Sequence, residues 1–410
     1  MKAKGRDTKP HVGIFGRRNV GKSSLINALV GQDIAIVSEI AGTTTDPVKK
    51  SIEIHGLGPL ILIDTAGIDD SGELGELRIK KTMDALKLID LAILVLSDNS
   101  FDDHEAELTQ EFGRLDIPYV IVHNKSDLSP VKDEFRKKIR NLTGREVAAY
   151  SALFPDRYNP ALLEMIKEAM PPITMKSHGL IGDLVNPGDI VLLVTPVDIE
   201  APEGRMILPQ VQVIRDALDN DCTAIILKET DIESFLEKTG IRPQLVVTDS
   251  QVFGKVNAVI PRDIPLTGFS IVLARQKGDF EEYLRGTPKI GELQDGDRVL
   301  LLESCTHNVS CEDIGRVKIP RWLTNFTGKK LDFDVVAGLD TFPRPIEDYA
   351  LVIQCGGCMV THRQLVNRLR EPKKHNVAIT NYGMAIAYLH GIFDRAIEPF
   401  TGKRQEAGDL

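Results

Sequence analysis

The sequence predicts an α/β protein in which a parallel-sheet nucleotide-binding domain precedes two smaller α/β domains. Over residues 1–170, short apolar runs alternate with segments of helical spacing, which is typical of strand–helix–strand units. A glycine-rich loop stands between the first apolar run and the first helical segment. The pattern breaks at 170–172 and at 261–268, where prolines cannot continue a helix. A chain of 410 residues has room for two or three domains.

The elements follow in chain order. In the first domain, residues 1–172, strands are expected at Val12–Phe15, Leu60–Ile63, Leu91–Leu96, Tyr119–Val122 and Val147–Tyr150, and a helix at Ser24–Leu29. In the second, residues 180–264, we expect strands at Ile190–Val194, Ala224–Leu227 and Leu245–Val247, and helices at Leu208–Asp219 and Asp231–Lys238. In the third, residues 266–410, we expect strands at Ile271–Ala274, Arg298–Leu302 and Ala350–Ile353, and helices at Arg363–Arg370 and Gly383–Ile397.

Composition limits the class of function. The formal charge is −9, and residues 181–410 carry 26 basic against 33 acidic side chains, which argues against a nucleic-acid partner. No apolar run reaches the length of a membrane span, and no apolar segment follows the basic N-terminus as in a secretory signal. Five cysteines in a chain of this length do not form a disulfide framework. We therefore expect a soluble cytoplasmic protein.

Residues 16–23 read GRRNVGKS, which fits the phosphate-loop pattern G-x-x-x-x-G-K-[ST] between a strand and a helix. Gly16 and Gly21 let the backbone curl so that its N–H groups converge on phosphate oxygens, and Ser24 extends these contacts into the helix. Lys22 is expected to reach the β- and γ-phosphates, and Ser23 to ligate Mg²⁺.

Two segments are expected to respond to the γ-phosphate. Asp64 ends a predicted strand, where its carboxylate can hold Mg²⁺ through the waters of the ion, and Gly67 can sense the γ-phosphate through its N–H. Residues 42–46 read GTTTD and lie between the phosphate loop and Asp64. Thr44 is the expected second Mg²⁺ hydroxyl, ordered only when the γ-phosphate is present.

A third set of residues selects the base. Asp127 offers two acceptor oxygens to the N1–H and 2-amino group of guanine, a donor pair that adenine lacks. Asn124 can bridge the base and the phosphate loop, and the stem of Lys125 can stack on the base. Ser151 and Ala152 end the fifth strand and can present backbone N–H groups to guanine O6. These residues predict GTP rather than ATP as the substrate.

These motifs, in this order and spacing, resemble the GTPases of the Era and tRNA-modification type over residues 1–160. In such GTPases the residue at position 19, an asparagine, helps to hold a K⁺ ion near the β- and γ-phosphates, so the resemblance implies K⁺-stimulated hydrolysis. Ile68 stands where Ras-like proteins have a water-orienting glutamine. Relatives usually have arginine at the position of Thr45.

The cysteines point to a second site. All of them follow residue 221, and Cys355 and Cys358 enclose two glycines after a predicted strand. Cys305, followed by His307, lies at the end of another predicted strand. A redox pair, a structural Zn²⁺ site and an iron–sulfur site with an exchangeable fourth ligand are the alternatives that the spacing leaves open.

This cysteine pattern behind an Era-like domain resembles the [FeFe]-hydrogenase maturation GTPases, the HydF family, over the whole chain. The resemblance implies that residues 180–264 form a dimerisation domain and 266–410 an iron–sulfur domain. It also implies a [4Fe–4S] cluster on Cys305, Cys355 and Cys358. The protein would act as scaffold and carrier of the diiron precursor of the hydrogenase active site. Its partners would be the two radical-SAM maturases and apo-[FeFe]-hydrogenase, and a homodimer is expected.

The fourth cluster ligand stays open. Many family members have histidine directly before the C-x-x-C motif, where this chain has Gln354. His307, Glu312 or an exogenous ligand can fill the position. Cys311 and Cys222 are expected to be structural thiols.

Two other functions compete with a hydrogenase maturase. An RNA-associated GTPase of ribosome assembly or tRNA modification explains residues 1–160 equally well but gives the cysteines no role. A GTP-dependent binding switch with a purely structural C-terminal metal is the third hypothesis. In the maturase, GTP turnover is expected to time loading or partner exchange.

Overall fold

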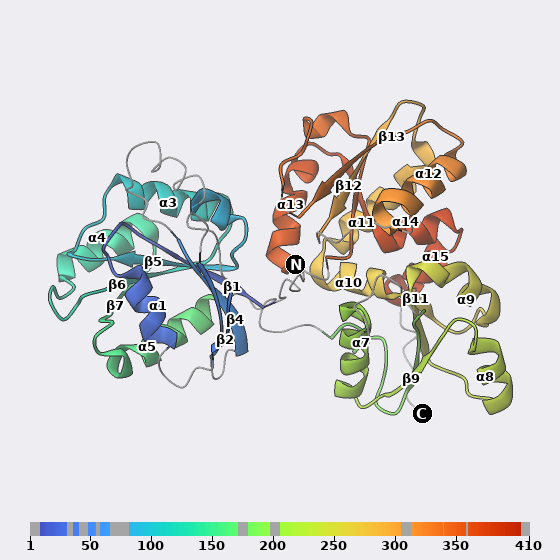
Figure 1. Ribbon diagram of the computed structural model, residues 1–410, viewed down its shortest axis with the longest axis horizontal. Helices are drawn as coiled ribbons and strands as arrows, with labels where there is room; N and C mark the ends of the chain where they lie inside the picture. Colours follow the sequence, from blue (N-terminus) through green and yellow to red (C-terminus); the bar gives the residue numbers. More distant parts are fainter. Residues whose placement is uncertain are drawn as a thin grey trace. The chain divides into compact units, whose positions relative to one another are not determined.

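The computed structural model describes residues 9–30, 36–40, 48–54, 58–65, 82–170, 179–196, 206–304, 313–338, 340–357 and 360–402. Its contacts divide the chain into two compact units, Thr8–Lys176 and a unit that contains Ser177–Leu410. The predicted α/β fold class is confirmed, since each described sheet is flanked by helices (Figure 1). The predicted limits of the three domains stay predictions.

The first unit contains a seven-stranded sheet in the order β2-β3-β4-β1-β5-β6-β7. Its strands are β1 (His11–Phe15), β2 (Ile36–Ile40), β3 (Val48–Ile54), β4 (Gly58–Asp64), β5 (Leu91–Leu96), β6 (Tyr119–His123) and β7 (Val147–Ala149). The β2–β3 and β3–β4 pairs are antiparallel, and the other pairs are parallel. The strand candidates of the first domain are therefore found, and β2 and β3 are additional.

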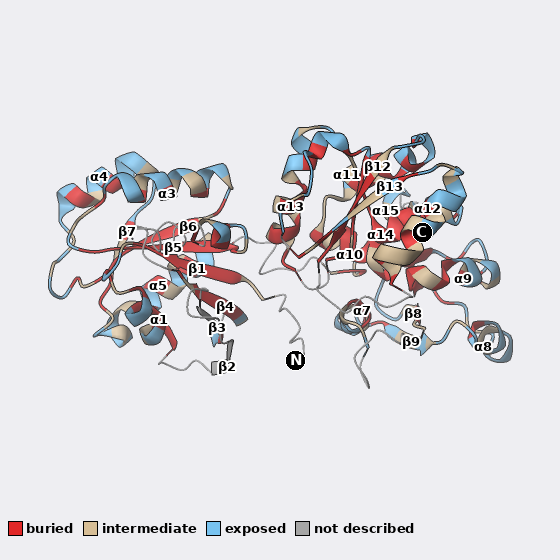
Figure 2. Ribbon diagram, turned by 45° about the horizontal axis from the view of Figure 1, so that its top comes forward, coloured by how far each residue is buried: buried red, intermediate tan, exposed pale blue. Residues whose placement is uncertain are grey.

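Helices cover both faces of this sheet: α1 (Lys22–Val30), α3 (Asp103–Arg114), α4 (Asp133–Thr143) and α5 (Pro155–Ala169). Apolar side chains of α1 and α5 share one core, and those of α3 and α4 share the other. Strand β5 is buried along its whole length because alternate side chains enter the two cores (Figure 2). This explains why its sequence is a continuous apolar run.

The second unit contains two four-stranded parallel sheets, in the orders β11-β10-β8-β9 and β13-β12-β14-β15. The strands of the first of these sheets are β8 (Ile190–Val194), β9 (Thr223–Leu227), β10 (Leu245–Thr248) and β11 (Leu266–Gly268). Those of the other are β12 (Arg298–Glu303), β13 (Asp332–Ala337), β14 (Leu351–Gln354) and β15 (Ala378–Asn381). The strands β11, β13 and β15 were not among the candidates.

The α-helices of this unit are α7 (Leu208–Asp219), α8 (Ile232–Thr239), α9 (Phe253–Val259), α10 (Phe269–Lys277), α11 (Phe280–Gly286), α12 (Ile319–Thr327), α13 (His362–Lys374), α14 (Tyr382–Leu389) and α15 (Phe393–Thr401). Short 3₁₀ or π turns occur at η1 (Ser250–Val252), η2 (Thr287–Glu292), η3 (Ile314–Lys318) and η4 (Ile346–Asp348). The helix predicted at Gly383–Ile397 is two helices, since the chain turns at Gly391, whose φ is +71°.

The strand predicted at Ile271–Ala274 is wrong, because these residues lie in α10. Helix α10 lies between the two sheets of this unit (Figure 1). Phe269 and Val272 pack into the core of the β8–β11 sheet, whereas Ile271 and Ala274 pack into the core of the β12–β15 sheet. A helix buried on both sides lacks a polar face, so its short apolar run looks like a buried strand.

Candidate nucleotide and cysteine sites

The phosphate loop runs from the end of β1 to the start of α1 and depends on two glycines. Gly16 has φ +146° and Gly21 has φ +92°, conformations that L side chains rarely adopt. A Cβ atom on Gly16 would lie 2.3 Å from the carbonyl oxygen of Val95, and one on Gly21 would lie 2.2 Å from Nδ2 of Asn124. The loop therefore packs against β5 and Asn124 as closely as a bare backbone allows.

Lys22 places a positive charge over this loop. It is the first residue of α1, and its side chain is buried. Its Nζ donates to the carbonyl oxygens of Gly16 (2.9 Å) and Arg17 (2.7 Å). The ammonium group is thus held at the phosphate loop by the loop's own backbone, in a position suited to phosphate oxygens.

Ser23 and Asp64 come together although they are far apart in the sequence. The Ser23 hydroxyl donates to Oδ2 of Asp64 at 2.7 Å, where β4 ends beside the phosphate loop. A hydroxyl and a carboxylate are hard oxygen ligands of the kind that Mg²⁺ prefers. These side chains fit a Mg²⁺ site next to the loop. Ser24 follows in the first turn of α1, with an exposed side chain.

Asn124 connects the expected base-binding segments to the phosphate loop. Its Nδ2 donates to the carbonyl oxygen of Val20 (2.9 Å), and its Oδ1 accepts from the Ala152 N–H (3.3 Å). Lys125 Nζ donates to the carbonyl oxygen of Asn19 at 2.6 Å. The loops after β1, β6 and β7 are thereby joined at one edge of the sheet, as nucleotide binding in an α/β fold requires.

The remaining base and cation candidates lie on the same loops. Asp127 is exposed, as base recognition requires, and Ser151 is fully buried. Asn19 has φ +61° and an exposed side chain. Thr44, Thr45, Gly67 and Ile68 lie outside the described residues.

Arg17 and Ser126 support the site and were missed from the sequence. Arg17 Nε donates to Oε1 of the buried Glu105 (2.6 Å), and Nη2 donates to Oδ2 of Asp102 (2.9 Å). The hydrogen bond that Arg17 donates to Glu105 raises the pKa of Arg17. These two carboxylates also form the capping box of α3, and the pattern D-x-x-E was the available signal. The Ser126 hydroxyl accepts a hydrogen bond from the Tyr150 N–H. This bond links the loops after β6 and β7, which carry the residues expected to bind the base.

The cysteine site begins where β12 and β14 end. The Cys355 Sγ accepts from the Ser304 N–H at 3.0 Å and lies 2.9 Å from the Ser304 hydroxyl. Ser304 directly precedes Cys305 in the sequence. Cys305, His307, Cys311, Glu312 and Cys358 themselves lie outside the described residues. Within the described ranges, no group of three or more metal-binding side chains occurs.

The position of Cys355 in the sheet is typical of a ligand site. The chain leaves β12 toward β13 on one side and returns to β14 on the other, so its winding direction reverses between β12 and β14. In parallel α/β sheets, ligands bind beyond the carboxyl ends of the strands at such a reversal. Cys355 and Ser304 stand at that point.

Buried polar side chains surround the C-x-x-C loop. Lys277, at the end of α10, donates through Nζ to the carbonyl oxygens of Gly357 (3.2 Å) and Val360 (3.3 Å), on either side of Cys358. Gln354 is fully buried, and its Nε2 donates to the Ser304 hydroxyl (3.2 Å). The loop is therefore held in place by side chains from its own strand and from α10.

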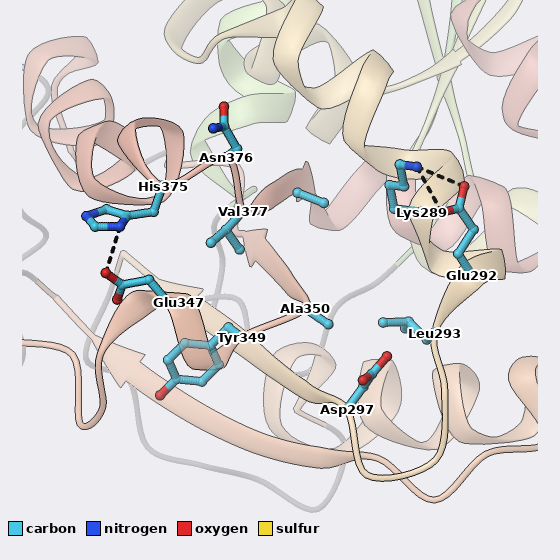
Figure 3. Close-up of a pocket in the computed structure, with 11 residues that line it drawn as sticks. Lys289, Glu292, Leu293, Asp297, Glu347, Tyr349, Ala350, His375, Asn376 and Val377 are labelled. Atoms are coloured by element: carbon cyan, nitrogen blue, oxygen red, sulfur yellow. Dashed lines mark hydrogen bonds and ion pairs between the residues drawn. The ribbon is translucent and has the colours of Figure 1, made fainter.

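A pocket of about 420 Å³ occupies the opposite edge of the same sheet (Figure 3). Asp297, Ala350 and Val377 line it and directly precede β12, β14 and β15. At one side of the pocket, Nδ1 of His375 lies 2.7 Å from Oε1 of Glu347 (Figure 3). This pocket lies at the amino ends of the strands and is separate from the cysteine site.

Cys222 is a structural thiol. It is buried beside α7, and its Sγ donates to the carbonyl oxygen of Asn186 at 3.3 Å. Burial raises the pKa of this thiol, which keeps it protonated and unreactive.

The fold and the phosphate loop define a P-loop GTPase with additional α/β domains. Residues 11–125 match the family model described as "50S ribosome-binding GTPase". Residues 180–278 match "Hydrogen maturase F dimerization domain", and 281–399 match "Hydrogen maturase F tetramerization domain". The chain belongs to the hydrogen maturase F (HydF) family.

Curated relatives include proteins that match part of this chain. The tRNA modification GTPase MnmE of Chromobacterium violaceum is 47% identical over 122 residues, which cover 29% of this chain and 26% of the relative. GTPase Der of Wolinella succinogenes is 35% identical over 166 residues, covering 38% and 34% respectively. The chain thus spans about a quarter to a third of the length of these relatives.

Solved structures that match this chain include Aquifex aeolicus Era bound to GDP·AlF4⁻. It is 20% identical, with a TM-score of 0.33, and the match covers 62% of this chain and 99% of that one. The G domain of the Thermotoga maritima FeoB iron transporter is 23% identical, with a TM-score of 0.32 and coverage of 39% and 98%. In the part of the chain that the structure describes, no helix is long and apolar enough to cross a membrane.

Proposed function

We propose that this hydrogen maturase GTPase is the scaffold and carrier that assembles the diiron precursor and delivers it to apo-[FeFe]-hydrogenase. The observation that carries the proposal is the meeting of Cys355 with Ser304, the residue before Cys305, at the reversal point of the β12–β15 sheet. Cysteine thiolates are the usual ligands of iron–sulfur clusters. A thiol positioned where α/β sheets bind ligands fits a cluster better than it fits a packing role.

The proposed cluster is a [4Fe–4S] centre on Cys305, Cys355 and Cys358, with His307, Glu312 or an exogenous ligand in the fourth position. A cluster with an exchangeable position suits a scaffold, because the incoming diiron unit needs a place to attach. Gln354 is engaged with Ser304 and the backbone, so it supports the loop.

The test is anaerobic purification and reconstitution with iron and sulfide, followed by absorption and EPR spectra and metal analysis. We expect an iron–sulfur signal that is lost in Cys355→Ser and retained in Cys222→Ser, the matched control at the buried structural thiol. A protein that takes up only zinc, with no iron–sulfur signal, would refute the scaffold function.

GTP hydrolysis follows from the first unit. In the proposed site Lys22 contacts the phosphates, Asp127 selects guanine, and Ser23 with Asp64 holds Mg²⁺, which neutralises phosphate charge when bound; the contacts of Lys22 with the loop and of Ser23 with Asp64 support this assignment. We propose that Asn19 helps to hold K⁺ beside the phosphates, where a monovalent cation supplies charge that an arginine finger supplies elsewhere.

We further propose that GTP binding orders Thr44 and Gly67, and that hydrolysis releases them, which times cluster loading or exchange of partners. The partners would be the two radical-SAM maturases and the apo-hydrogenase. If Lys22→Ala loads and transfers the diiron unit as the unchanged protein does, this coupling is wrong.

An oligomer is supported by the matches to dimerization and tetramerization domains. We propose a homodimer built through the middle domain. An RNA-associated function is not favoured, because residues 180–278 and 281–399 match hydrogen maturase domains and residues 181–410 carry 33 acidic against 26 basic side chains.

A further inference from the structure

Arg368 is a buried cation behind the cysteine site. It projects from α13, with 8% of its surface exposed. Its Nη1 donates to the carbonyl oxygen of Glu303 and its Nη2 to that of Val336, both at 2.5 Å. One guanidinium group therefore joins the carboxyl ends of β12 and β13 at the edge of the sheet where Cys355 lies.

The bond to Glu303 reaches the cysteine through a single peptide group. The Glu303 carbonyl and the Ser304 N–H belong to the same peptide unit, and that N–H donates to Sγ of Cys355 at 3.0 Å. The arrangement is a chain of guanidinium, peptide and sulfur. A cation on the carbonyl end polarises the peptide and strengthens the hydrogen bond at the N–H end.

The charge of Arg368 has no carboxylate partner among the described residues. Glu303, whose backbone it contacts, pairs instead with Arg316 through its carboxylate at 2.8 Å. Guanidinium stays protonated in proteins, and buried charges are normally paired with an opposite charge. The hydrogen bonds from Arg368 through the Glu303–Ser304 peptide end at Sγ of Cys355, so the cysteine site is where an anionic group would meet this charge.

We propose that Arg368 is a positioning residue of the cysteine site: it aims the Glu303–Ser304 peptide at Cys355, and its charge balances an anionic, thiolate-bound occupant. Ser304, the second residue of that peptide, precedes Cys305 in the sequence. The inference rests on the proposed cluster function. It predicts that Arg368 stabilises the reduced form of the cluster, because reduction adds a negative charge beside a fixed positive one.

Arg395 provides a matched control. It is also a buried arginine, 6% exposed, and its guanidinium donates to backbone oxygens of Ile260 and Pro261 and to the side chain of Asn257. These contacts tie α15 to α9 and to the segment that follows it, and they include no residue next to a cysteine. Arg395→Gln therefore removes the same kind of group without touching the Arg368–Ser304–Cys355 chain.

The experiment is an EPR-monitored redox titration of the full-length reconstituted protein in four forms: unchanged, Arg368→Gln, Arg368→Lys and Arg395→Gln. Iron content and far-UV circular dichroism are recorded for each form. We expect Arg368→Gln to shift the midpoint potential of the cluster to more negative values. Arg368→Lys, which keeps the charge, and Arg395→Gln, which keeps the site, are expected to titrate as the unchanged protein does.

An unshifted potential in Arg368→Gln, or an equal shift in Arg395→Gln, would overturn the assignment. If Arg368→Gln binds no cluster, retention of the cluster by Arg368→Lys supports the role of the charge. Loss in both, with Arg395→Gln intact, refutes it. Failure of the unchanged protein to take up a cluster is a separate result, which refutes the proposed function and with it this inference.

Discussion

Replacement of Gly21 by alanine tests how closely the phosphate loop depends on its backbone. Gly21 has φ +92°, and an added Cβ would lie 2.2 Å from Nδ2 of Asn124. That amide is 2.9 Å from the carbonyl oxygen of Val20 and belongs to a side chain with only 2% of its surface exposed. The substitution therefore strains the backbone and also displaces the residue that joins the loops.

The two costs can be assigned separately. A left-handed conformation costs a residue with a Cβ about 1–2 kcal/mol. Loss of the hydrogen bond of the buried Asn124 adds about 1–3 kcal/mol, because the amide and its partner are left unsatisfied. We expect Gly21→Ala to lower the unfolding free energy of the first unit by about 2–5 kcal/mol. Displacing Asn124 is also expected to weaken GDP binding by about tenfold or more, at 1.4 kcal/mol per factor of ten.

Gly144→Ala is the matched control, since Gly144 ends α4 with φ +69° and has no atom within 4 Å of an added Cβ. It should show the backbone cost alone and bind GDP normally. Urea denaturation and titration calorimetry with GDP measure both quantities. The reasoning is refuted if Gly21→Ala is no less stable than Gly144→Ala and binds GDP as tightly as the unchanged protein.

Three further predictions concern the same domain. Lys22→Ala should abolish GTP binding in calorimetry, because the phosphate loop loses the ammonium group that is expected to contact the β- and γ-phosphates; residual binding near the normal affinity would contradict this. GTP hydrolysis should be faster in KCl than in NaCl at equal ionic strength, and Asn19→Ala should remove the difference; equal rates for the unchanged protein would exclude the K⁺ site. Glu105→Gln should cost about 1–3 kcal/mol in urea denaturation, because the buried carboxylate that anchors Arg17 loses its charge. Asp102→Asn, at an exposed partner of the same arginine, should leave stability unchanged, and an equal loss in both variants would contradict the role of burial.

The sequence by itself determined the first α/β unit and the position of the phosphate loop. Both depend on local rules, because glycine dihedrals, the start of a helix after a strand and the 3.6-residue period involve neighbours in the chain. Strands β2 and β3 were missed because they add to one side of the sheet as an antiparallel pair. These two strands form because β3 pairs with β4, which lies beside it in the folded sheet. The sequences of β2 and β3 carry no local signal of that pairing.

Only the tertiary structure determined the helix of the second unit that lies between its sheets and the contacts that surround Cys355. Ile271–Ala274 forms a helix because two sheets cover it from opposite sides, which a short apolar run cannot reveal. The contact of Ser304 with Cys355 and the bond from Arg368 to Glu303 join residues 51 and 65 positions apart. Parallel strands bring such residues together only when their crossover connections are in place. The sequence spacing was therefore enough to identify the candidate cysteine ligands. The hydrogen bonds and the charge around Cys355 depend on the tertiary fold.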